Sequence, residues 1–325
     1  MSLWSSYLWI LVRTSSLNRL CFPRSPRRTF RACYGDDSSG KELVISFTTT
    51  AAVIQSMRRA HHIELTAYVL RTKRMLRVLE GAAKAGSRVR VRLEAFPYAD
   101  TDGRLARLNR DTVAELHAAG ADAELVDRSG QRAGHMKAAI VDGVAFLDDR
   151  NWPMGPRNTI VVDNDRRDVG VIRDAMGGTT ENLRNIAVTK GAALSQEASV
   201  LSTDAVQCGA SVETESFTAG TAPYRAVKLL ALRGVPVRLL ISKNDLKRGT
   251  LAAARALVRD GVAVRITGSA EKFAVAGDRA WIGSANATYG RDDQIDWGIT
   301  TTDCTLCPQL QARFNSTWRS ARPLR

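Results

Sequence analysis

The sequence predicts an α/β protein built from two similar halves, each a mixed β-sheet flanked by helices. Residues 134–151 are repeated at 269–286 with a constant offset of 135, so that Lys137 aligns with Lys272. Short apolar runs with strand character alternate with helix-periodic segments in both halves, as in sheets with helices on their faces. A length of 325 residues with 44% apolar content suits one such repeat pair with an ample core.

The N-terminal segment is expected to lie outside the fold. Residues 1–35 contain six arginines, no acidic residue and many serines, a composition that resembles a targeting segment. No apolar run approaches the ~18 residues of a transmembrane helix, which favours a soluble, cytoplasmic protein. We therefore expect an N-terminal extension, disordered or targeting, a first repeat, a linking helix and a second repeat, at residues 1–40, 41–178, 179–208 and 209–325.

The elements of the first half follow from its apolar periodicity and from glycines that end helices. Strands are predicted at 63–70, 88–95 and 122–126, and helices at 73–85 and 103–119. The second half repeats this order, with strands at 212–217, 235–241 and 262–267 and helices at 222–232 and 250–258. Residues 179–205 are helix-prone and poor in turn residues. A basic terminal helix at 308–322 carries Phe314 and Trp318 on one face, as expected core contacts.

The duplicated stretch is predicted to be a hairpin. Residues 138–141 and 144–147 are apolar strands on either side of Asp142-Gly143, so Asp142 is expected to serve mainly the turn. His135 and Lys137 are two residues apart, and on a strand both side chains leave the same face. Asn151 follows the hairpin. An imidazole, an ammonium and an amide that converge suit a phosphoryl group, and they require no metal or other cofactor.

Two incomplete motifs carry a resemblance to a known family. The first copy supplies His135, Lys137, Asp142 and Asn151, and the second supplies Lys272, Gly283, Ser284 and Asn286. Together they resemble the phospholipase D superfamily, whose signature H-x-K-(x4)-D with a following G-S-x-N usually occurs twice per chain. The resemblance covers roughly residues 60–170 and 210–300. It implies two phospholipase D-like repeats about a pseudo-twofold axis, both motifs in one cleft, and a monomer that is an intramolecular pseudo-dimer.

The resemblance also implies roles for individual residues. In the family one histidine attacks phosphorus to give a phosphohistidine, and the other protonates the leaving group. An acidic residue downstream of each motif orients its histidine. His135 is then the nucleophile and Asp168 orients it, with Lys137 and Lys272 completing the catalytic set. The substrate-binding set implied in the same way is Asn151, Ser284, Asn286 and Asp296, the last of which matches Asp168 in the second half.

Both copies depart from the family pattern. Ala270 stands where the second histidine is expected, and it can neither attack nor donate a proton. Asp148 and Asp149 replace the Gly-Ser of the first copy. These two carboxylates would repel a phosphodiester unless they are turned away, paired with Arg150 or Arg157, or protonated. They form either a solvated turn or the source of the missing proton. Glu271 is a weaker candidate for that proton, because on a strand it points away from the cleft.

Composition limits the expected classes of binding partner but does not choose among those classes. The formal net charge of +14 favours phosphate-bearing partners, namely nucleic acid or phospholipid headgroups, although a solvated arginine-rich surface explains it as well. Five cysteines argue against a disulfide scaffold, and Cys304-x-x-Cys307 is interpreted as structural. The sequence thus predicts a metal-independent phosphodiesterase or phosphatidyltransferase acting through His135 on a phosphodiester. The alternative is a protein that binds anionic lipid or nucleic acid without turnover.

Overall fold

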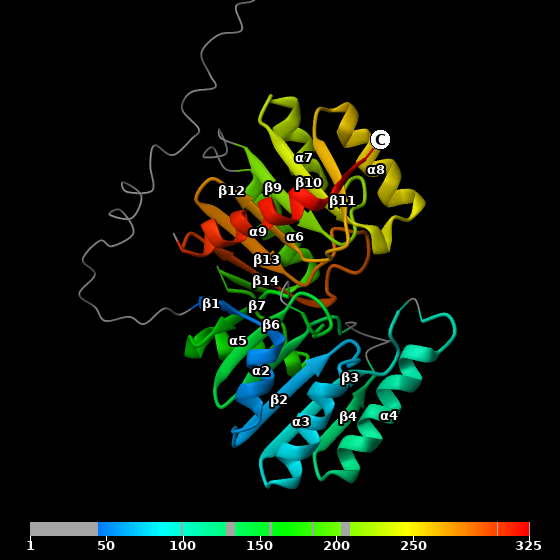
Figure 1. Cartoon of the computed structure of the whole chain (residues 1–325), viewed down its shortest axis with the longest axis vertical. Coiled ribbons are helices and arrows are strands. Elements are labelled where there is room, and N and C mark those ends of the chain that lie inside the picture. Colours follow the sequence, from blue (N-terminus) through cyan, green and yellow to red (C-terminus); the bar gives the residue numbers. More distant parts are fainter. Residues whose placement is uncertain are drawn as a thin grey trace, which may run out of the picture. The chain divides into compact units, whose positions relative to one another are not determined.

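The computed structural model describes residues 45–98, 100–127, 134–155, 158–183, 185–202, 209–303 and 305–324, and two mixed β-sheets carry this part of the chain (Figure 1). In the order in which they pair, the strands of the first sheet are β1 (Ile45–Thr48), β7 (Ile160–Asp163), β6 (Val144–Asp148), β5 (Ala138–Val141), β2 (His62–Ala67), β3 (Arg88–Glu94) and β4 (Asp122–Val126). Those of the second are β8 (Ile186–Thr189), β14 (Ile295–Thr301), β13 (Arg279–Gly283), β12 (Phe273–Ala276), β9 (Ala210–Thr214), β10 (Val237–Ser242), β11 (Ala263–Thr267) and β15 (Arg322–Pro323). Apart from β15, the two orders match strand for strand, as a duplicated α/β unit requires.

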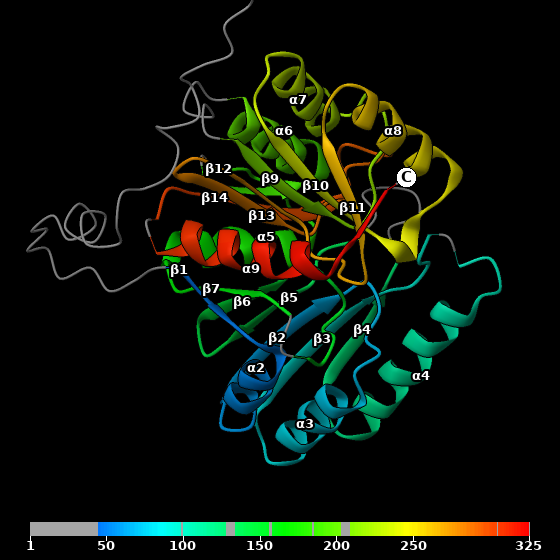
Figure 2. The same cartoon turned by 45° about the horizontal axis from the view of Figure 1, so that its top comes forward.

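Helices cover both faces of each sheet (Figure 2). The outer face of the first sheet packs against α2 (Thr50–Met57), α3 (Lys73–Lys84) and α4 (Arg104–Ala118). The outer face of the second packs against α6 (Lys190–Leu201), α7 (Ala222–Leu232) and α8 (Arg248–Arg259). Helices α5 (Arg166–Gly177) and α9 (Leu306–Ser320) lie between the sheets. Each sheet is therefore buried on both sides, which explains why its central strands are almost continuously apolar.

One core cluster holds the two sheets together. It draws apolar side chains from both hairpins and from α5 and α9. Phe273 on β12 meets Phe314 on α9 edge to face, with ring centroids 6.4 Å apart. Trp297 on β14 is fully buried, and its indole N–H donates to the carbonyl of Asp148 in the first sheet over 2.9 Å. The predicted fold class, two mixed sheets flanked by helices, is confirmed.

The predicted strands and helices agree with the structure to within a few residues, but the linking segment differs. Residues 179–205 contain a strand, β8, before helix α6. In the second sheet β8 and α6 take the positions that β1 and α2 take in the first. The reason is local: Ile186 and Val188 are fully buried, and Ile186 pairs with Ile299 of β14. The second sheet thus begins before residue 209.

The remaining expectations concern the termini and cysteines. Phe314 is fully buried and stacks on Trp318 at 5.5 Å, as predicted for core contacts. The Cys307 thiol lies 3.3 Å from the carbonyl of Asp278, and burial raises its pKa to about 12. Cys304 and the expected extension at 1–40 lie outside the described residues. In the described part of the chain, no helix combines the length and the apolarity needed to cross a bilayer.

Two glycine substitutions test the packing of the second hairpin. A Cβ at Gly283 would lie 2.5 Å from the carbonyl oxygen of Trp297 and 2.6 Å from the ring of Trp281, so Gly283→Ala forces the strands apart. We expect a loss of about 1–3 kcal/mol in the free energy of unfolding, measured by urea denaturation. The control is Gly81→Ala in α3, where a Cβ meets nothing within 4 Å. That change should stabilise by roughly 0.5–1 kcal/mol. An unchanged midpoint for Gly283→Ala would contradict the packing.

Candidate active site

A cleft of about 570 Å³ opens where the parallel strands of both sheets end. Open α/β sheets commonly bind ligands outside the carboxyl ends of their strands. Its lining comes from loops after β2, β3, β6, β9, β10 and β13 and from the segment that enters β5. The lining includes Tyr68, Tyr98, His135, Asn151, Glu215, Lys247, Asn286 and Tyr289.

His135 is held by a carboxylate from the other sheet. Its backbone N–H donates to the carbonyl of Ile295 over 2.8 Å, which draws the segment before β5 against the start of β14. Its ring Nδ1 lies 2.8 Å from Oδ1 of Asp296. A proton shared between Nδ1 and this carboxylate leaves Nε2 as the nitrogen with a free lone pair.

The environment keeps the imidazole neutral. Burial, followed by the charge of Lys137, lowers the pKa of His135 below its ordinary value, although Asp296 acts in the opposite direction. Burial alone would raise the pKa of Asp296. The charge and hydrogen bond of His135 and the charge of Lys137 outweigh burial and hold that pKa below its usual range. A neutral histidine beside an ionised aspartate is therefore the resting pair near pH 7.

Ser284 and Gln294 fix the carboxylate in turn. Ser284 Oγ donates to Asp296 Oδ1 over 2.7 Å and accepts the backbone N–H of Trp297 over 3.0 Å. Gln294 Nε2 donates to Asp296 Oδ2 over 2.7 Å. Ser284 was expected to bind substrate, but it is fully buried and its hydroxyl is committed to Asp296. Asp296 itself, also expected at the substrate, contacts the histidine.

Asp168 is not the residue that faces His135. It lies in the first turn of α5, where its Oδ2 accepts Asn185 Nδ2 over 2.7 Å. Strand register identifies another counterpart of Asp296. Asp148 and Gly283 occupy equivalent positions in the two hairpins. Asp148 pairs with Ile160 in the first sheet, and Gly283 pairs with Gly298 in the second. Asn158 lies two positions before Ile160, and Asp296 lies two positions before Gly298. The half that lost its histidine has thus also lost its carboxylate.

The two motif lysines are buried beneath the cleft lining, where Lys272 contacts the lining residue Glu215 and Lys137 contacts the lining residue Tyr68. Lys272 Nζ pairs with Glu215 at 3.1 Å and donates to the carbonyl of Asp149 at 2.8 Å. Burial would lower the pKa of Lys272, but Glu215 and Asp149 outweigh burial and raise it. Lys137 lies 5.6 Å from the ring centroid of Tyr68. Burial, reinforced by the charge of Lys272, lowers its pKa to about 7.

Glu215 and Tyr68 are counterparts that the sequence did not reveal. Ala138 and Phe273 are equivalent positions in the two hairpins. Thr66 of β2 pairs with Ala138, and Glu213 of β9 pairs with Phe273. Two residues further on, Tyr68 covers one lysine and Glu215 the other. The charge of Lys272 is the main reason that the pKa of Glu215 falls to about 2. Only a strand-by-strand alignment of β2 with β9 brings the two positions together.

Asn151 and Asn286 line the cleft as expected. The side-chain Oδ1 of each is buried and has no hydrogen-bond partner among the described residues. Asn151 precedes Trp152, a fully buried residue with a φ of +53°. A bulky side chain rarely adopts this conformation, so surrounding packing fixes the turn that presents Asn151. The two amide groups lie beside the histidine, where their oxygens can accept and their N–H groups can donate hydrogen bonds to a ligand.

Asp148 and Asp149 lie outside the cleft lining and are fully buried, so they do not form a solvated turn. Asp149 Oδ2 accepts the backbone N–H of Lys272 over 2.8 Å, and Oδ1 lies 3.4 Å from Nε of Arg150. Glu271 belongs to the same buried group, with Arg313 at 2.8 Å. These carboxylates join the two sheets rather than face a substrate. Asp142 caps the backbone N–H groups of His61 and His62, in keeping with a turn role.

The His135–Asp296 pair can be tested without any substrate. Asp296→Asn removes the charge that favours the imidazolium, so the pKa of His135 should fall further below its ordinary value. NMR titration of the ring protons measures this shift, and His135→Asn identifies the resonance. Asp168→Asn is the control and should leave the titration unchanged. Equal effects of the two substitutions would contradict the geometry.

Comparison of the sequence with protein families finds no family model that matches, and no curated protein matches either. The structure, in contrast, is similar to solved structures. Polyphosphate kinase from Porphyromonas gingivalis superposes with a TM-score of 0.62 at 15% identity, over 85% of this chain. The chain spans 47% of that protein. Phosphatidylserine synthase from Haemophilus influenzae superposes with a TM-score of 0.61 at 10% identity, over 92% of this chain and 91% of the other.

A third structure matches one half of the chain. It is Nuc from Salmonella typhimurium, a phospholipase D family member, with 18% identity and a TM-score of 0.39 over 43% of this chain and 97% of that one. The polyphosphate kinase and the phosphatidylserine synthase share the phospholipase D-like fold and superpose over most of this chain. The protein therefore has the phospholipase D-like fold, with two repeats in one chain.

Proposed function

We propose that the protein is a phosphoryl-transfer enzyme that cleaves or exchanges a phosphodiester through a phosphohistidine at His135. The observation that carries this proposal is the 2.8 Å contact between His135 Nδ1 and Asp296 beside a cleft lined by Asn151 and Asn286, with two buried lysines behind its lining. A neutral, oriented imidazole is a nucleophile, and the surrounding cations and amides suit the oxygens of a phosphoryl group.

The first half-reaction forms the covalent intermediate. The Nε2 lone pair of His135 attacks phosphorus, the P–N bond forms and the P–O bond to the leaving group breaks. The ring becomes cationic, and Asp296 stabilises it through the Nδ1 proton. Lys137, Asn151 and Asn286 bind the non-bridging oxygens as charge redistributes. The departing oxygen takes a proton from solvent or from a group in the cleft.

The second half-reaction regenerates the histidine. Water, in hydrolysis, or an alcohol, in transfer, attacks phosphorus on the face opposite Nε2, and the P–N bond breaks. The attacking oxygen gives its proton to solvent as the P–O bond forms. Glu215 is not suited to accept this proton, because its pair with Lys272 lowers its pKa to about 2. No metal is needed for either step, because cationic side chains supply the positive charge.

A protein that binds phosphodiesters without turnover is the second candidate. Two observations favour it: Ala270 replaces the second histidine, and Asn158 replaces the carboxylate that would orient it. The enzyme remains the better-supported proposal, because the set around His135 is complete across the two repeats.

Covalent labelling separates the two candidates. Incubation with a nitrophenyl phosphodiester followed by an alkaline quench should yield a phosphorylated peptide that contains His135, detected by mass spectrometry. His135→Asn should give no label. Asp296→Asn should slow labelling by roughly 10²–10⁴-fold, the usual contribution of an oriented acid–base pair. Asp168→Asn, the matched control, should label at the normal rate. A label on another residue, or normal turnover by His135→Asn, would contradict the proposal.

Because Ala270 cannot donate a proton, the reaction rate is expected to depend strongly on the leaving group of the substrate. General acid catalysis contributes about 10²–10⁴-fold, so the protein should turn over nitrophenyl diesters but be slow with alkoxide leaving groups. Ala270→His should recover part of the second activity, and the double variant Ala270→His/Asn158→Asp should recover more, because the new imidazole then has its carboxylate. Initial rates with both substrate classes measure this. Ala270→Gln fills the space without a proton donor and serves as the control. Rapid cleavage of alkyl diesters by the unmodified protein would show that another acid is present.

A further inference from the structure

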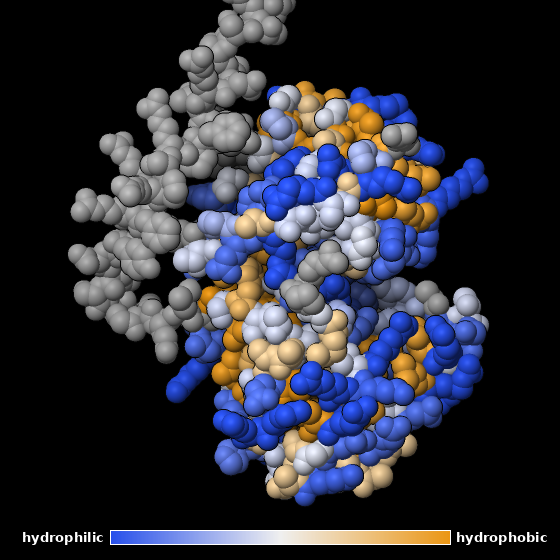
Figure 3. All heavy atoms as spheres, in the orientation of Figure 1, coloured by the Kyte–Doolittle hydropathy of each residue, from blue (hydrophilic) through white to orange (hydrophobic). Residues whose placement is uncertain are grey.

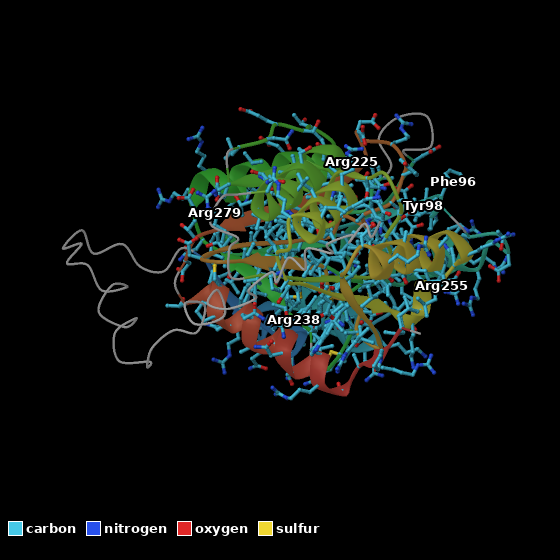
Figure 4. The ribbon with its side chains drawn as sticks, turned by 90° about the horizontal axis from the view of Figure 1, so that it is seen from above. Phe96, Tyr98, Arg225, Arg238, Arg255 and Arg279 are labelled. Atoms are coloured by element: carbon cyan, nitrogen blue, oxygen red, sulfur yellow. The ribbon has the colours of Figure 1, made fainter. Side chains whose placement is uncertain are left out.

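Two exposed aromatic side chains line the cleft, and a third lies near one of them. Tyr98 is 51% exposed and Tyr289 is 69% exposed, and both line the cleft. Phe96, 60% exposed, precedes Tyr98 by two residues, and Figure 4 shows both on the same side of the molecule. Aromatic residues make up only 6% of the chain. Their concentration at one exposed opening therefore points to a ligand.

Tyr98 is fixed beside the histidine. Its ring centroid lies 5.8 Å from that of His135 and 5.2 Å from that of Tyr68. The Tyr68 hydroxyl donates to the backbone carbonyl of Tyr98 over 2.6 Å, which ties down the loop after β3. A planar group attached to a phosphate at His135 thus meets this ring first.

Tyr289 lies on the opposite repeat. A Cβ at Gly220 would lie 2.2 Å from its hydroxyl, so the phenol rests against the backbone of Gly220. The ammonium of buried Lys190 donates to the backbone carbonyl of Tyr289 over 3.4 Å and to Thr288 Oγ1 over 3.2 Å. These bonds anchor the loop that presents the exposed ring at the cleft.

Exposed aliphatic side chains are found elsewhere. Leu229, Leu232 and Val258 lie in the last turns of α7 and α8, none of them lines the cleft, and Figure 3 shows apolar surface in that region. The cleft instead touches the first turn of α8 at Thr250, about 12 Å along the helix from Val258 at 1.5 Å per residue. A phospholipid would need aliphatic surface for its acyl chains at the cleft. The aromatic side chains at the cleft instead suit a ligand with flat rings.

We propose that the cleft binds single-stranded nucleic acid, with unpaired bases on either side of the bound phosphate stacked on Tyr98 and Tyr289. Stacking on aromatic side chains is tolerant of sequence and is the usual way in which proteins hold single strands. Lys247 lines the same cleft and is 79% exposed; its ammonium pairs with Asp245 at 3.0 Å and can turn to a neighbouring phosphate. This inference rests on the proposed function for its central phosphate site, and it adds the substrate class.

Binding to short oligonucleotides tests the inference. Fluorescein-labelled dT12 and rU12 are titrated with the full chain carrying His135→Asn, which prevents turnover, and fluorescence anisotropy gives Kd. Tyr98→Ala and Tyr289→Ala should each weaken binding roughly 5- to 150-fold, the range that corresponds to the loss of one stacked base. Tyr98→Phe keeps the ring and should bind normally. Leu232→Ala, an exposed apolar residue away from the cleft, is the matched control and should also bind normally.

The remaining outcomes separate this inference from the proposed function. Vesicles of phosphatidylglycerol and phosphatidylcholine that bind more tightly than dT12, with loss of binding in Leu232→Ala, would identify a lipid surface and overturn the inference. Unchanged oligonucleotide affinity in both tyrosine variants would also overturn it, even where His135 becomes phosphorylated by a nitrophenyl diester. Tyrosine-dependent binding of dT12 or rU12 without any phosphohistidine would support the inference and refute the catalytic proposal.

Discussion

The hydrogen bond between His135 and Asp296 joins the two repeats at the point where their motifs meet. Its two partners come from different sheets, and the backbone bond from His135 to Ile295 holds the strands in the register that the side-chain bond needs. Much of the packing between the two sheets holds this pair of residues in place. Helices α5 and α9 fill the space between the sheets, and the buried contacts of Trp297 and Lys272 with the chain at Asp148 and Asp149 lock one hairpin against the other.

The two halves of the site have diverged together. The first histidine keeps its carboxylate and the serine that supports that carboxylate. At the position of the missing histidine the carboxylate is replaced by Asn158, which now binds Thr50 over 2.6 Å and Arg150. Asp149, where the second copy has Ser284, has become part of a buried ionic group. The differences are physically consistent, since an orienting carboxylate with nothing to orient is a buried charge that must find another partner.

Much of the fold could be predicted from the sequence, because strand and helix periods are local properties. The hairpin around Asp142 and the helix ends at Gly86 and Gly120 are examples. Residues 186–201 were harder, because their place depends on pairing with a strand more than a hundred residues later. The roles of Asp168 and Glu215 were beyond sequence reasoning for a similar reason.

Asp168 and Asp296 are both followed by an apolar residue and a glycine, so the letters match although one lies on a helix and the other on a strand. Glu215 has no motif at all. Its role can be inferred only from its short distance to Lys272 in the structure. Both cases show that a short pattern identifies a residue type, whereas register and three-dimensional proximity identify its partner.

The ion pair between Lys272 and Glu215 affects how readily a reaction product leaves the cleft. Lys272 already has an internal counter-ion and the pKa of Lys137 is about 7, so the positive charge behind His135 is completed when a bound phosphate favours protonation of Lys137. A ligand with a single negative charge is matched by that balance. One with two negative charges is not, and it also faces the ionised Glu215. If hydrolysis of a diester yields a monoester, the product is expelled by its own additional charge, and turnover does not stall on a tightly held end product.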